Sequence, residues 1–392
     1  MRPAQRTTQL GVEGAFDVLT RARALEAQGR HIIHLEIGEP DFPTPAHIVE
    51  AGKRALDEGF THYGPTMGLS DLREAIAADA AATRGIPVDP SQVCVTPGAK
   101  PALFYAMMAT LEPGDEVLLP DPGFPIYASL ARYLEAVPVA VPLLESQQFA
   151  YDLNFLADHL TSRTKMVILN SPHNPSGGVM SHGDVKALAD LLIGRDIVVV
   201  SDEIYRTIYF GDGAPASIAS VPGMADNTII IDGFSKSHAM TGWRLGYGVY
   251  PKWLTDTISK LMVNSNSCTA SFVQKAGVAA IAGPQTDRLR MVEEFRARRN
   301  AFVTQLTSIP GFHGGVPLGA FYAYPNISET GKNSKELEVA LLNEAGVACL
   351  AGTSFGGTGS QHLRFSMANS LENLALAAKR VEHWMNVVPV PS

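Results

Sequence analysis

Apolar residues recur along this chain in short runs that are separated by longer, amphipathic segments. The run IVVV at 197–200 is typical of a strand that is buried on both faces. Helices are predicted between such strands, for example over 99–111, 125–135 and 181–193. Strands that alternate with helices indicate a mostly parallel sheet covered by helices. The predicted strands cover residues 92–96, 115–120, 137–141, 165–169, 196–200, 228–232 and 245–250.

The pattern changes toward the carboxyl end of the chain. A long charged segment from Gln285 to Ser308 carries apolar residues among charged ones, which predicts one helix that leaves the sheet. Short strands are predicted near 320–324 and 361–366, followed by a helix over Leu371–Val387. This different pattern of short strands and long helices favours a second, smaller α+β domain. A further amphipathic helix is predicted over Ala15–Arg30.

Composition narrows the class of protein. The chain has 392 residues and 46% hydrophobic content, enough for a large core and about two or three domains. Its net charge of −8 disfavours a nucleic-acid partner, because phosphate backbones attract basic surfaces. Cys94, Cys268 and Cys349 are widely spaced, so neither a disulfide framework nor a zinc site is expected. Without a signal-peptide core or an apolar run of roughly 20 residues, we expect a cytoplasmic protein with no membrane partner.

The most informative segment is DGFSKSHAMTGWRLGY at 232–247. It places Lys236 between the hydroxyl of Ser235 and the guanidinium of Arg244. Burial and nearby positive charge lower the pKa of a lysine, which prepares it to form a Schiff base. A hydroxyl and a guanidinium are suited to bind phosphate, the guanidinium as a two-pronged donor. An exposed basic turn is the alternative interpretation of this segment alone.

A second segment, SDEIY at 201–205, follows a predicted buried strand. Its polar side chains therefore lie at the sheet edge where ligands of α/β proteins bind. Asp202 could hold magnesium, be a structural acid, or pair with a pyridinium nitrogen. Magnesium is disfavoured, because the chain contains neither G-x-x-x-x-G-K-[ST] nor G-x-G-x-x-G after a strand. Asn174 can donate to a phenolate oxygen, although Asn-Pro pairs are most often turns.

Together these segments resemble those of the fold-type-I, class I and II pyridoxal-phosphate aminotransferases, and they are nearest to prokaryotic aspartate aminotransferases. The resemblance covers nearly the whole chain. It implies a three-layer, mostly parallel α/β large domain of the pyridoxal-phosphate transferase fold at 50–284, and a smaller α+β domain made of 1–49 and 285–392. It rests on GEPDFPTP (38–45), YGPTMGLSDLR (63–73), TPGAKPAL (96–103), PGFPIY (122–127), NSPHNPSG (170–177), SDEIY, the Lys236 segment, LGAFYAYP (318–325) and LRFSMANS (363–370).

The resemblance assigns the cofactor chemistry residue by residue. It implies that Lys236 forms the Schiff base with pyridoxal 5'-phosphate and then carries the proton between the substrate Cα and the cofactor. It implies that Asp202 pairs with the pyridine nitrogen, and that Tyr205 and Asn174 hydrogen-bond the ring oxygen. Phe124 falls where the family has an aromatic ring stacked on the cofactor, commonly a tryptophan in aspartate aminotransferases.

The phosphate site is also implied by the resemblance. The backbone of Ala99 and Lys100 at a helix start is expected to bind the phosphate, together with Ser235 and Arg244. Little weight falls on the Lys100 side chain. Tyr63 is expected to reach the phosphate from a second subunit, which implies a homodimer with shared active sites.

Arg364 is implied to clamp the substrate α-carboxylate, with help from Asn174 and the Gly38 backbone. Residue type alone leaves other interpretations open. Tyr63 and Phe124 could be core aromatics, and Arg364 could form a surface ion pair on its strand.

The histidines receive no catalytic role. His173 and His238 stand beside key residues, and we expect solvated loop positions for both. His31 and His34 have no third ligand at metal spacing, so no metal site is expected.

These observations predict an aminotransferase that moves an α-amino group from an amino acid to a 2-oxo acid by a ping-pong mechanism. A carbon–sulfur β-lyase with the same cofactor is the alternative enzyme. A cofactor-sensing regulator would need a fused DNA-binding domain, whereas the family motifs begin by residue 38 of an acidic chain. No motif identifies a cation for a second substrate carboxylate. Broad amino-acid specificity, with 2-oxoglutarate or pyruvate as acceptor, is therefore expected ahead of aspartate specificity.

Overall fold

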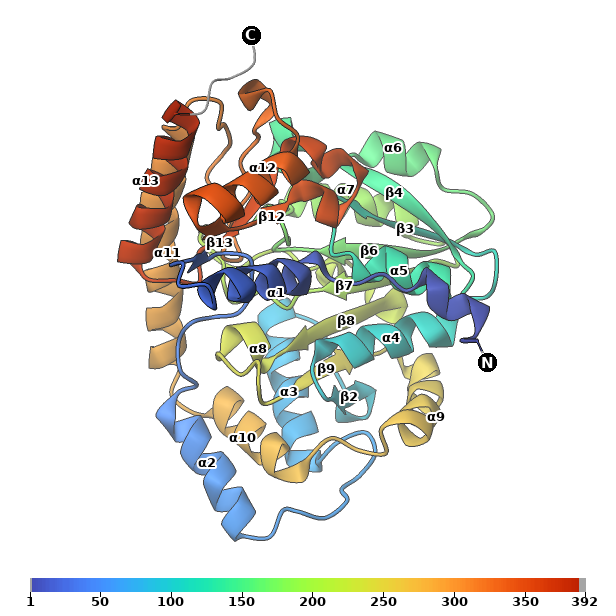
Figure 1. The fold of residues 1–392 in the computed structure, drawn as a ribbon. Helices are drawn as coiled ribbons and strands as arrows, with labels where there is room; N and C mark the ends of the chain where they lie inside the picture. Colours follow the sequence, from blue (N-terminus) through green and yellow to red (C-terminus); the bar gives the residue numbers. More distant parts are fainter. Residues whose placement is uncertain (1, 388–392) are drawn as a thin grey trace.

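The computed structural model of the protein describes residues 2–387. Its largest element is an eight-stranded sheet in the order β2-β9-β8-β7-β6-β3-β4-β5 (Figure 1). Strands β3, β4, β6, β7 and β8 pair in parallel, whereas β9 and β5 run antiparallel to their neighbours. The strands are β2 Val93–Thr96, β3 Glu116–Asp121, β4 Val137–Leu144, β5 Ala150–Tyr151, β6 Thr164–Asn170, β7 Val198–Asp202, β8 Thr228–Gly233 and β9 Gly246–Val249.

Helices cover both faces of this sheet, because its central strands are apolar on both faces. Val198 and Val200 pack against α4, α5 and α9 on one face. Val199, between them, points to the other face and packs with α6 and α7. The expected three-layer α/β fold is confirmed. The helices are α2 Ala46–Asp57, α3 Ser70–Arg84, α4 Ala99–Thr110, α5 Ile126–Tyr133, α6 Leu153–Asp158, α7 His182–Leu192, α8 Phe234–Ser237, α9 Thr255–Ser265 and α10 Ser271–Ala282.

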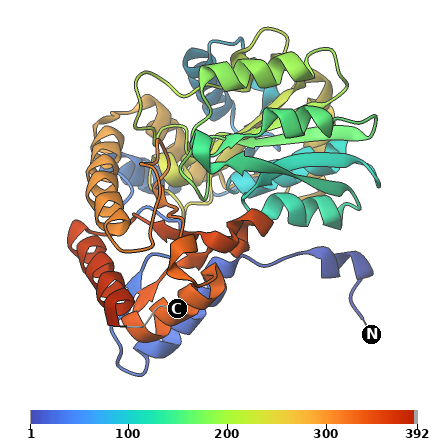
Figure 2. The ribbon, with the colours of Figure 1, turned by 90° about the horizontal axis from the view of Figure 1, so that it is seen from above.

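Both chain ends build a second group of elements beside the large sheet (Figure 2). Strand β1 pairs in parallel with β11, which joins segments that are far apart in the sequence. Apolar side chains of α11 and α13 form a core with these short strands. The division into 50–284 and the two chain ends stays a prediction. The elements are α1 Gly14–Glu26, β1 Ile33–His34, α11 Thr286–Thr307, β10 Tyr322–Ala323, α12 Ser334–Ala340, β11 Val347–Ala348, β12 Leu350–Ala351, β13 Leu363–Ser366 and α13 Leu371–Val387.

Two elements end earlier than the sequence predicts, one for a local reason and one for a tertiary reason. The helix predicted over Ala15–Arg30 ends at Glu26, and Gly29 has a φ of 85°, which a helix cannot continue through. The strand predicted over 320–324 shrinks to Tyr322–Ala323, because only these two residues pair with β13.

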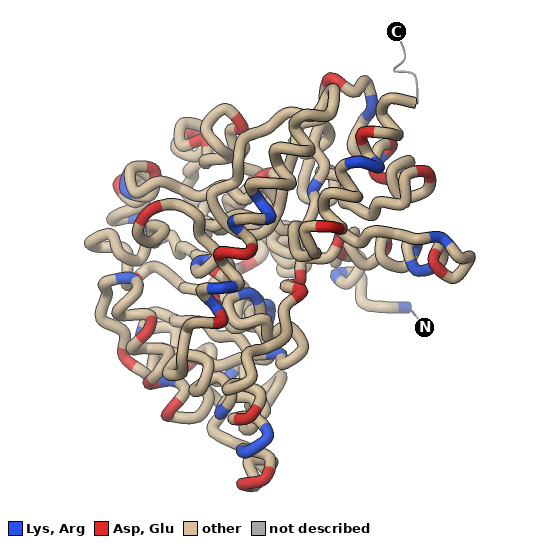
Figure 3. The backbone as a smooth tube through the Cα atoms, turned by 90° about the vertical axis from the view of Figure 1, so that its left-hand side faces the viewer, with Lys and Arg blue, Asp and Glu red and all other residues tan. Residues whose placement is uncertain are grey.

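Charged residues of both signs are interspersed along the elements visible in Figure 3. No helix within residues 2–387 has the length and apolar character needed to cross a membrane.

Candidate active site

A pocket lies at the carboxyl ends of β6 and β7, beside the start of α4. Tyr63 does not line it, and its side chain is 92% exposed, which excludes a core position. The other predicted site residues all line the pocket although they are far apart in the sequence. They are Gly38, Ala99, Lys100, Phe124, Asn174, Asp202, Tyr205, Ser235, Lys236, Arg244 and Arg364.

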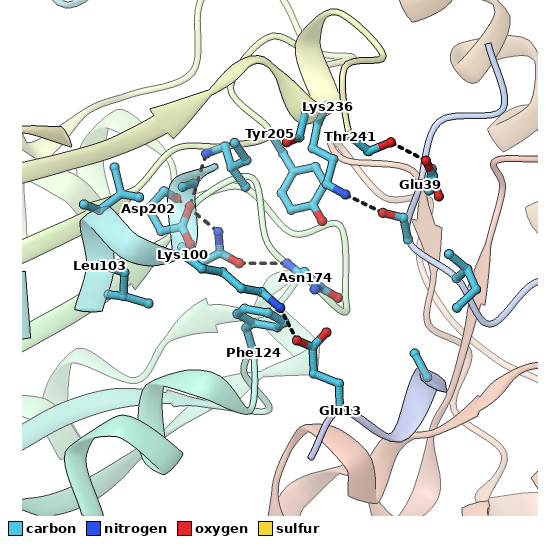
Figure 4. Close-up of a pocket in the computed structure, with 18 of the residues that line it drawn as sticks. Glu13, Glu39, Lys100, Leu103, Phe124, Asn174, Asp202, Tyr205, Lys236 and Thr241 are labelled. Carbon is cyan, nitrogen blue, oxygen red and sulfur yellow. Dashed lines mark hydrogen bonds and ion pairs between the residues drawn. The ribbon is translucent and has the colours of Figure 1, made fainter. Parts of the chain in front are cut away.

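Lys236 lies on the single turn of α8, which follows β8 directly. Its Nζ donates to the backbone oxygen of Gly38 at 2.5 Å (Figure 4). Burial is the main cause that lowers the pKa of Lys236 to about 8, and the cations of Arg364 and Arg244 lower it further. A lysine with this pKa can release its proton near neutral pH, as a Schiff-base or proton-transfer lysine must.

Gly38 allows its own segment to pack closely between Lys236 and Tyr322. A Cβ added at Gly38 would lie 2.2 Å from the hydroxyl oxygen of Tyr322, so a larger residue does not fit. The Tyr322 hydroxyl in turn lies 2.7 Å from that of Tyr205. The predicted Tyr205 therefore belongs to a pair of buried hydroxyls.

Asp202 ends strand β7 and faces the pocket. The hydroxyl of Tyr127 donates to its Oδ2 at 2.7 Å, and the backbone N–H of Ile204 donates to Oδ1 at 3.2 Å. Burial raises the pKa of Asp202 to about 6. The carboxylate is thus held by two donors while burial disfavours its charge, and a cationic partner would relieve this cost.

Buried charges behind Asp202 fix the end of β7. The guanidinium of Arg84, on α3, donates to Glu203 at 2.8 Å and to Asp232 at 2.7 Å. All three side chains are buried. Two buried carboxylates thus share one cation, and the contact joins α3 to β7 and β8.

Arg364, on β13, is buried rather than part of a surface ion pair. Its Nη1 donates to Oδ1 of Asn174 at 3.1 Å, and its Nη2 donates to the backbone oxygen of Glu36 at 2.5 Å. Nε has no hydrogen-bond partner among the described residues. A guanidinium with a free buried donor is suited to hold a carboxylate.

The start of α4 forms a cradle for an anion together with Ser235 and Arg244. The first N–H groups of a helix have no partner within it, and the positive end of the helix dipole lies there. Gly98 precedes the helix with a φ of 91°, and an added Cβ would lie 2.1 Å from Nη2 of Arg244. The close approach of Arg244 therefore requires glycine at position 98.

The Lys100 side chain lies at the pocket rather than away from it, although the resemblance predicts a role only for its backbone. Its Nζ is 5.4 Å from the centroid of the Phe124 ring and forms an ion pair with Glu13 (Figure 4). The Phe124 ring meets that of Tyr127 edge to face, with 5.7 Å between centroids. A cation and an aromatic ring thus lie side by side in the pocket wall.

The expectation of solvated loop histidines is wrong. His173 is buried beside the hydroxyl of Ser176 at 2.7 Å, and burial lowers its pKa to about 3. His238 is buried beside the hydroxyl of Ser237 at 2.7 Å, and burial lowers its pKa to about 4. Both loops fold against the protein core, which a single sequence does not reveal. Both imidazoles are therefore neutral at neutral pH.

The amino-terminal histidines each contact charged side chains, His31 that of Arg380 and His34 those of two glutamates. His34 contacts the carboxylates of Glu36 and Glu26, and these contacts raise its pKa to about 9. Within the described part of the chain, no group of three or more His, Cys, Asp or Glu side chains could hold a metal ion.

The sequence did not single out several side chains that complete the pocket. Tyr127 and Tyr322 lie inside the segments PGFPIY and LGAFYAYP. The motifs include both residues but do not indicate that their hydroxyls contact Asp202 and Tyr205. Asn170 accepts from the backbone N–H of Asn174 at 2.9 Å and links β6 to the pocket. Glu13 lies outside every motif, and no sequence signal pointed to it.

Residues 30–381 match the family described as aminotransferase class I and II. The chain belongs to this family. It is 40% identical over 357 residues to an aspartate aminotransferase of Pyrococcus abyssi, covering 90% of this chain and 91% of that protein. It is 37% identical over 360 residues to aromatic-amino-acid aminotransferase 2 of Thermococcus litoralis, covering 91% and 92%. The crystal structure of the aspartate aminotransferase from Rhizobium meliloti matches with a TM-score of 0.94 at 33% identity, over 98% of this chain and 99% of that one.

Membership of the class I and II aminotransferases confirms the predicted enzyme class. The relatives named above are aminotransferases, so the carbon–sulfur lyase alternative is not favoured. Their names include both aspartate and aromatic amino acids, so the names of the relatives do not select one substrate.

Proposed function

We propose that this aminotransferase binds pyridoxal 5'-phosphate in the pocket and transfers amino groups among a broad set of amino acids, with a dicarboxylate as one substrate. The observation that carries the proposal is the convergence of Lys236, Asp202 and Arg364 on one pocket. These three side chains come from α8, β7 and β13. A reactive amine, a carboxylate and a carboxylate-binding guanidinium are the groups that amino-acid chemistry with this cofactor requires.

The pocket fits the cofactor in its donor and acceptor groups. Asp202, whose charge is disfavoured by burial, suits a ring nitrogen that bears a proton. The hydroxyl of Tyr205 and the amide of Asn174 suit a ring oxygen, while the start of α4, Ser235 and Arg244 suit a phosphate. When bound, pyridoxal phosphate supplies a carbonyl carbon that condenses with amines and a ring that withdraws electrons from the substrate Cα.

The chain's own residues then position the substrate and move its proton. Arg364 binds the α-carboxylate with its free Nε, and its contact with Asn174 fixes the direction of the guanidinium. Lys236, with its lowered pKa, takes the proton from the substrate Cα and returns it to complete the transfer.

Lys100 supplies a cation for a second carboxylate. Lys236, Arg244 and Arg364 also line the pocket, but they serve as the reactive amine, the phosphate ligand and the α-carboxylate ligand. Lys100, which pairs with Glu13 of the same chain, is therefore the cation left to bind the distal carboxylate of glutamate, aspartate or their 2-oxo acids. The Phe124 ring beside it offers apolar surface to a neutral or aromatic side chain. Adjacent cationic and apolar surface supports broad specificity, with 2-oxoglutarate as an acceptor.

We also propose a homodimer in the cytoplasm. The exposed ring of Tyr63 is a large apolar group that a second copy of the chain would cover, bringing the hydroxyl to the neighbouring phosphate site. The three cysteines are unpaired, which supports a reducing compartment.

The variant Lys236→Ala tests the assignment of the reactive lysine. We expect it to lose the visible absorbance of the covalently bound cofactor and to lower turnover by roughly a thousandfold or more, because general-base catalysis is removed. Excess cofactor should not restore activity. Lys260→Ala, an exposed lysine of α9, is the control. A linkage to another lysine that borohydride can reduce, together with ordinary turnover, would show that Lys236 is not the reactive residue.

A further inference from the structure

Glu13 places a carboxylate of the protein beside Lys100, a cation of the pocket. Its side chain forms an ion pair with Lys100, in which Glu13 is 25% and Lys100 47% exposed. Figure 4 shows the Glu13 carboxylate beside the Phe124 ring, at the end of the Lys100 side chain. Both residues line the pocket that holds Lys236 and Arg364. Glu13 thus pairs with Lys100, the cation that we propose for the second carboxylate of the substrate.

Contacts on both sides hold Glu13 in this place. The backbone N–H of Gly11 donates to the hydroxyl of Ser129, on α5, at 2.9 Å. Helix α1 begins at Gly14, where an added Cβ would lie 2.9 Å from the Ser354 hydroxyl oxygen. The segment that carries Glu13 is therefore anchored to the large sheet layer before it and packed against the second group of elements after it.

Glu13 lines the pocket together with Tyr322 and Arg364. Burial is the main cause that raises the pKa of Tyr322; Arg364 and the hydrogen bond with Tyr205 lower it, and the Glu13 carboxylate adds a smaller increase. Tyr322 contacts Tyr205 there and lies under the guanidinium of Arg364, 4.5 Å from ring centroid to carbon. Glu13 therefore lines the same pocket as these groups.

We propose that Glu13 is a specificity-determining residue of this aminotransferase. It neutralises Lys100 when the substrate side chain is neutral or aromatic, and it gives up Lys100 to the second carboxylate of a dicarboxylate substrate. The inference rests on the proposed function, in which Lys100 binds that carboxylate.

The physical reason is a competition for one cation. An unpaired lysine covered by an apolar side chain would lose hydration without compensation, so Glu13 favours neutral substrates. A dicarboxylate must displace Glu13 from Lys100, and it also meets the repulsion of a second negative charge. Glu13 thus raises the relative preference for neutral donors.

The variant Glu13→Gln tests this competition in the holoenzyme. We expect the ratio of kcat/KM for glutamate to kcat/KM for phenylalanine to rise about fivefold, the equilibrium factor that corresponds to a partly exposed ion pair. Calorimetry with two unreactive acids provides a second readout. Maleate, a dicarboxylate, should bind more tightly to the variant, whereas 3-phenylpropionate, a monocarboxylate, should not.

Asp17→Asn is the matched control. Asp17 lies four residues after Glu13, in the first turn of α1, and its side chain is 64% exposed. The variant therefore removes the same charge from a nearby exposed position. Its substrate ratio should equal that of the unmodified enzyme. An unchanged ratio and unchanged maleate affinity in Glu13→Gln would overturn the role of Glu13.

Lys100→Met separates this inference from the proposed function. Reduced maleate affinity in Lys100→Met, with no effect of Glu13→Gln, rejects the competition alone. Unchanged maleate affinity in Lys100→Met rejects the substrate role of Lys100, and the Glu13 inference then fails with it.

Discussion

The buried position of Asp202 suits its proposed role beside the cofactor but lowers the free energy of unfolding. Its carboxyl is buried, and burial raises its pKa from the ordinary 3.8 to about 6. In the unfolded chain the same group releases its proton at lower pH. The folded state therefore binds the extra proton between about pH 4 and pH 6, and the free energy of unfolding falls as the pH rises through this window.

The variant Asp202→Asn removes this penalty. In the cofactor-free protein at pH 7.5 we expect the free energy of unfolding to rise by about 1–3 kcal/mol, since a shift of one pKa unit corresponds to about 1.4 kcal/mol. The gain should shrink to about 0.5 kcal/mol near pH 4, where the aspartate is protonated in the folded state and about half protonated in the unfolded chain. Urea denaturation at both pH values measures the difference.

Asp196→Asn, at a side chain that is 97% exposed, is the control and should change little at either pH. In the holoenzyme, Asp202→Asn should slow removal of the substrate Cα proton in single-turnover experiments. Equal stability gains at pH 4 and pH 7.5 would contradict the assigned pKa.

At the scale of elements, the end of β7 is held by charge as well as by the strand ladder. Arg84 ties α3 to Glu203, the residue after Asp202, and to Asp232 at the end of β8. Hydroxyl donors from Ser201 and Ser217 also reach Glu203. The contact therefore links a helix layer to the strands that carry Asp202 and lead into Lys236.

Loss of the guanidinium in Arg84→Met should destabilise the protein by roughly 3–5 kcal/mol, because two buried carboxylates are left without their shared partner. Chemical denaturation measures this difference. Arg290→Met is the matched control on α11, where the arginine is 80% exposed and pairs with Asp287. A loss no larger than that of the control would mean that Arg206, 3.8 Å from Glu203, suffices as its partner.

At the scale of the whole molecule, the pocket of one chain does not include Tyr63. The ring is 92% exposed, yet it lies in the segment YGPTMGLSDLR, which resembles a family motif of the phosphate site. A second copy of the chain would explain both observations. The proposed homodimer would then build each site from two chains.

Mixed dimers test this arrangement. A Tyr63→Phe chain with intact Lys236 is refolded with a Lys236→Ala chain that has intact Tyr63. We expect the mixture to gain activity, because half of the sites in each heterodimer combine Lys236 with the partner's Tyr63. Sedimentation should detect no active monomer. Activity that equals the sum of the two separate variants would contradict shared sites.

The sequence alone determined the order of elements and the motif residues, because these depend on local pattern. Apolar runs gave the strands of the large sheet, and Lys236, Asp202 and Arg364 stood out through their neighbours in the chain. Eleven of the predicted residues line one pocket, and their roles stay predictions.

The tertiary structure decided the contacts between segments far apart in the chain. The hydroxyls of Tyr127 and Tyr322 reach Asp202 and Tyr205 only because the fold brings α5 and β10 to the carboxyl end of β7. Burial of His173 and the pairing of Glu13 with Lys100 likewise leave no periodicity or motif in the sequence. Hydrogen bonds, desolvation and ion pairs depend on distance in space, and a single sequence records only distance along the chain.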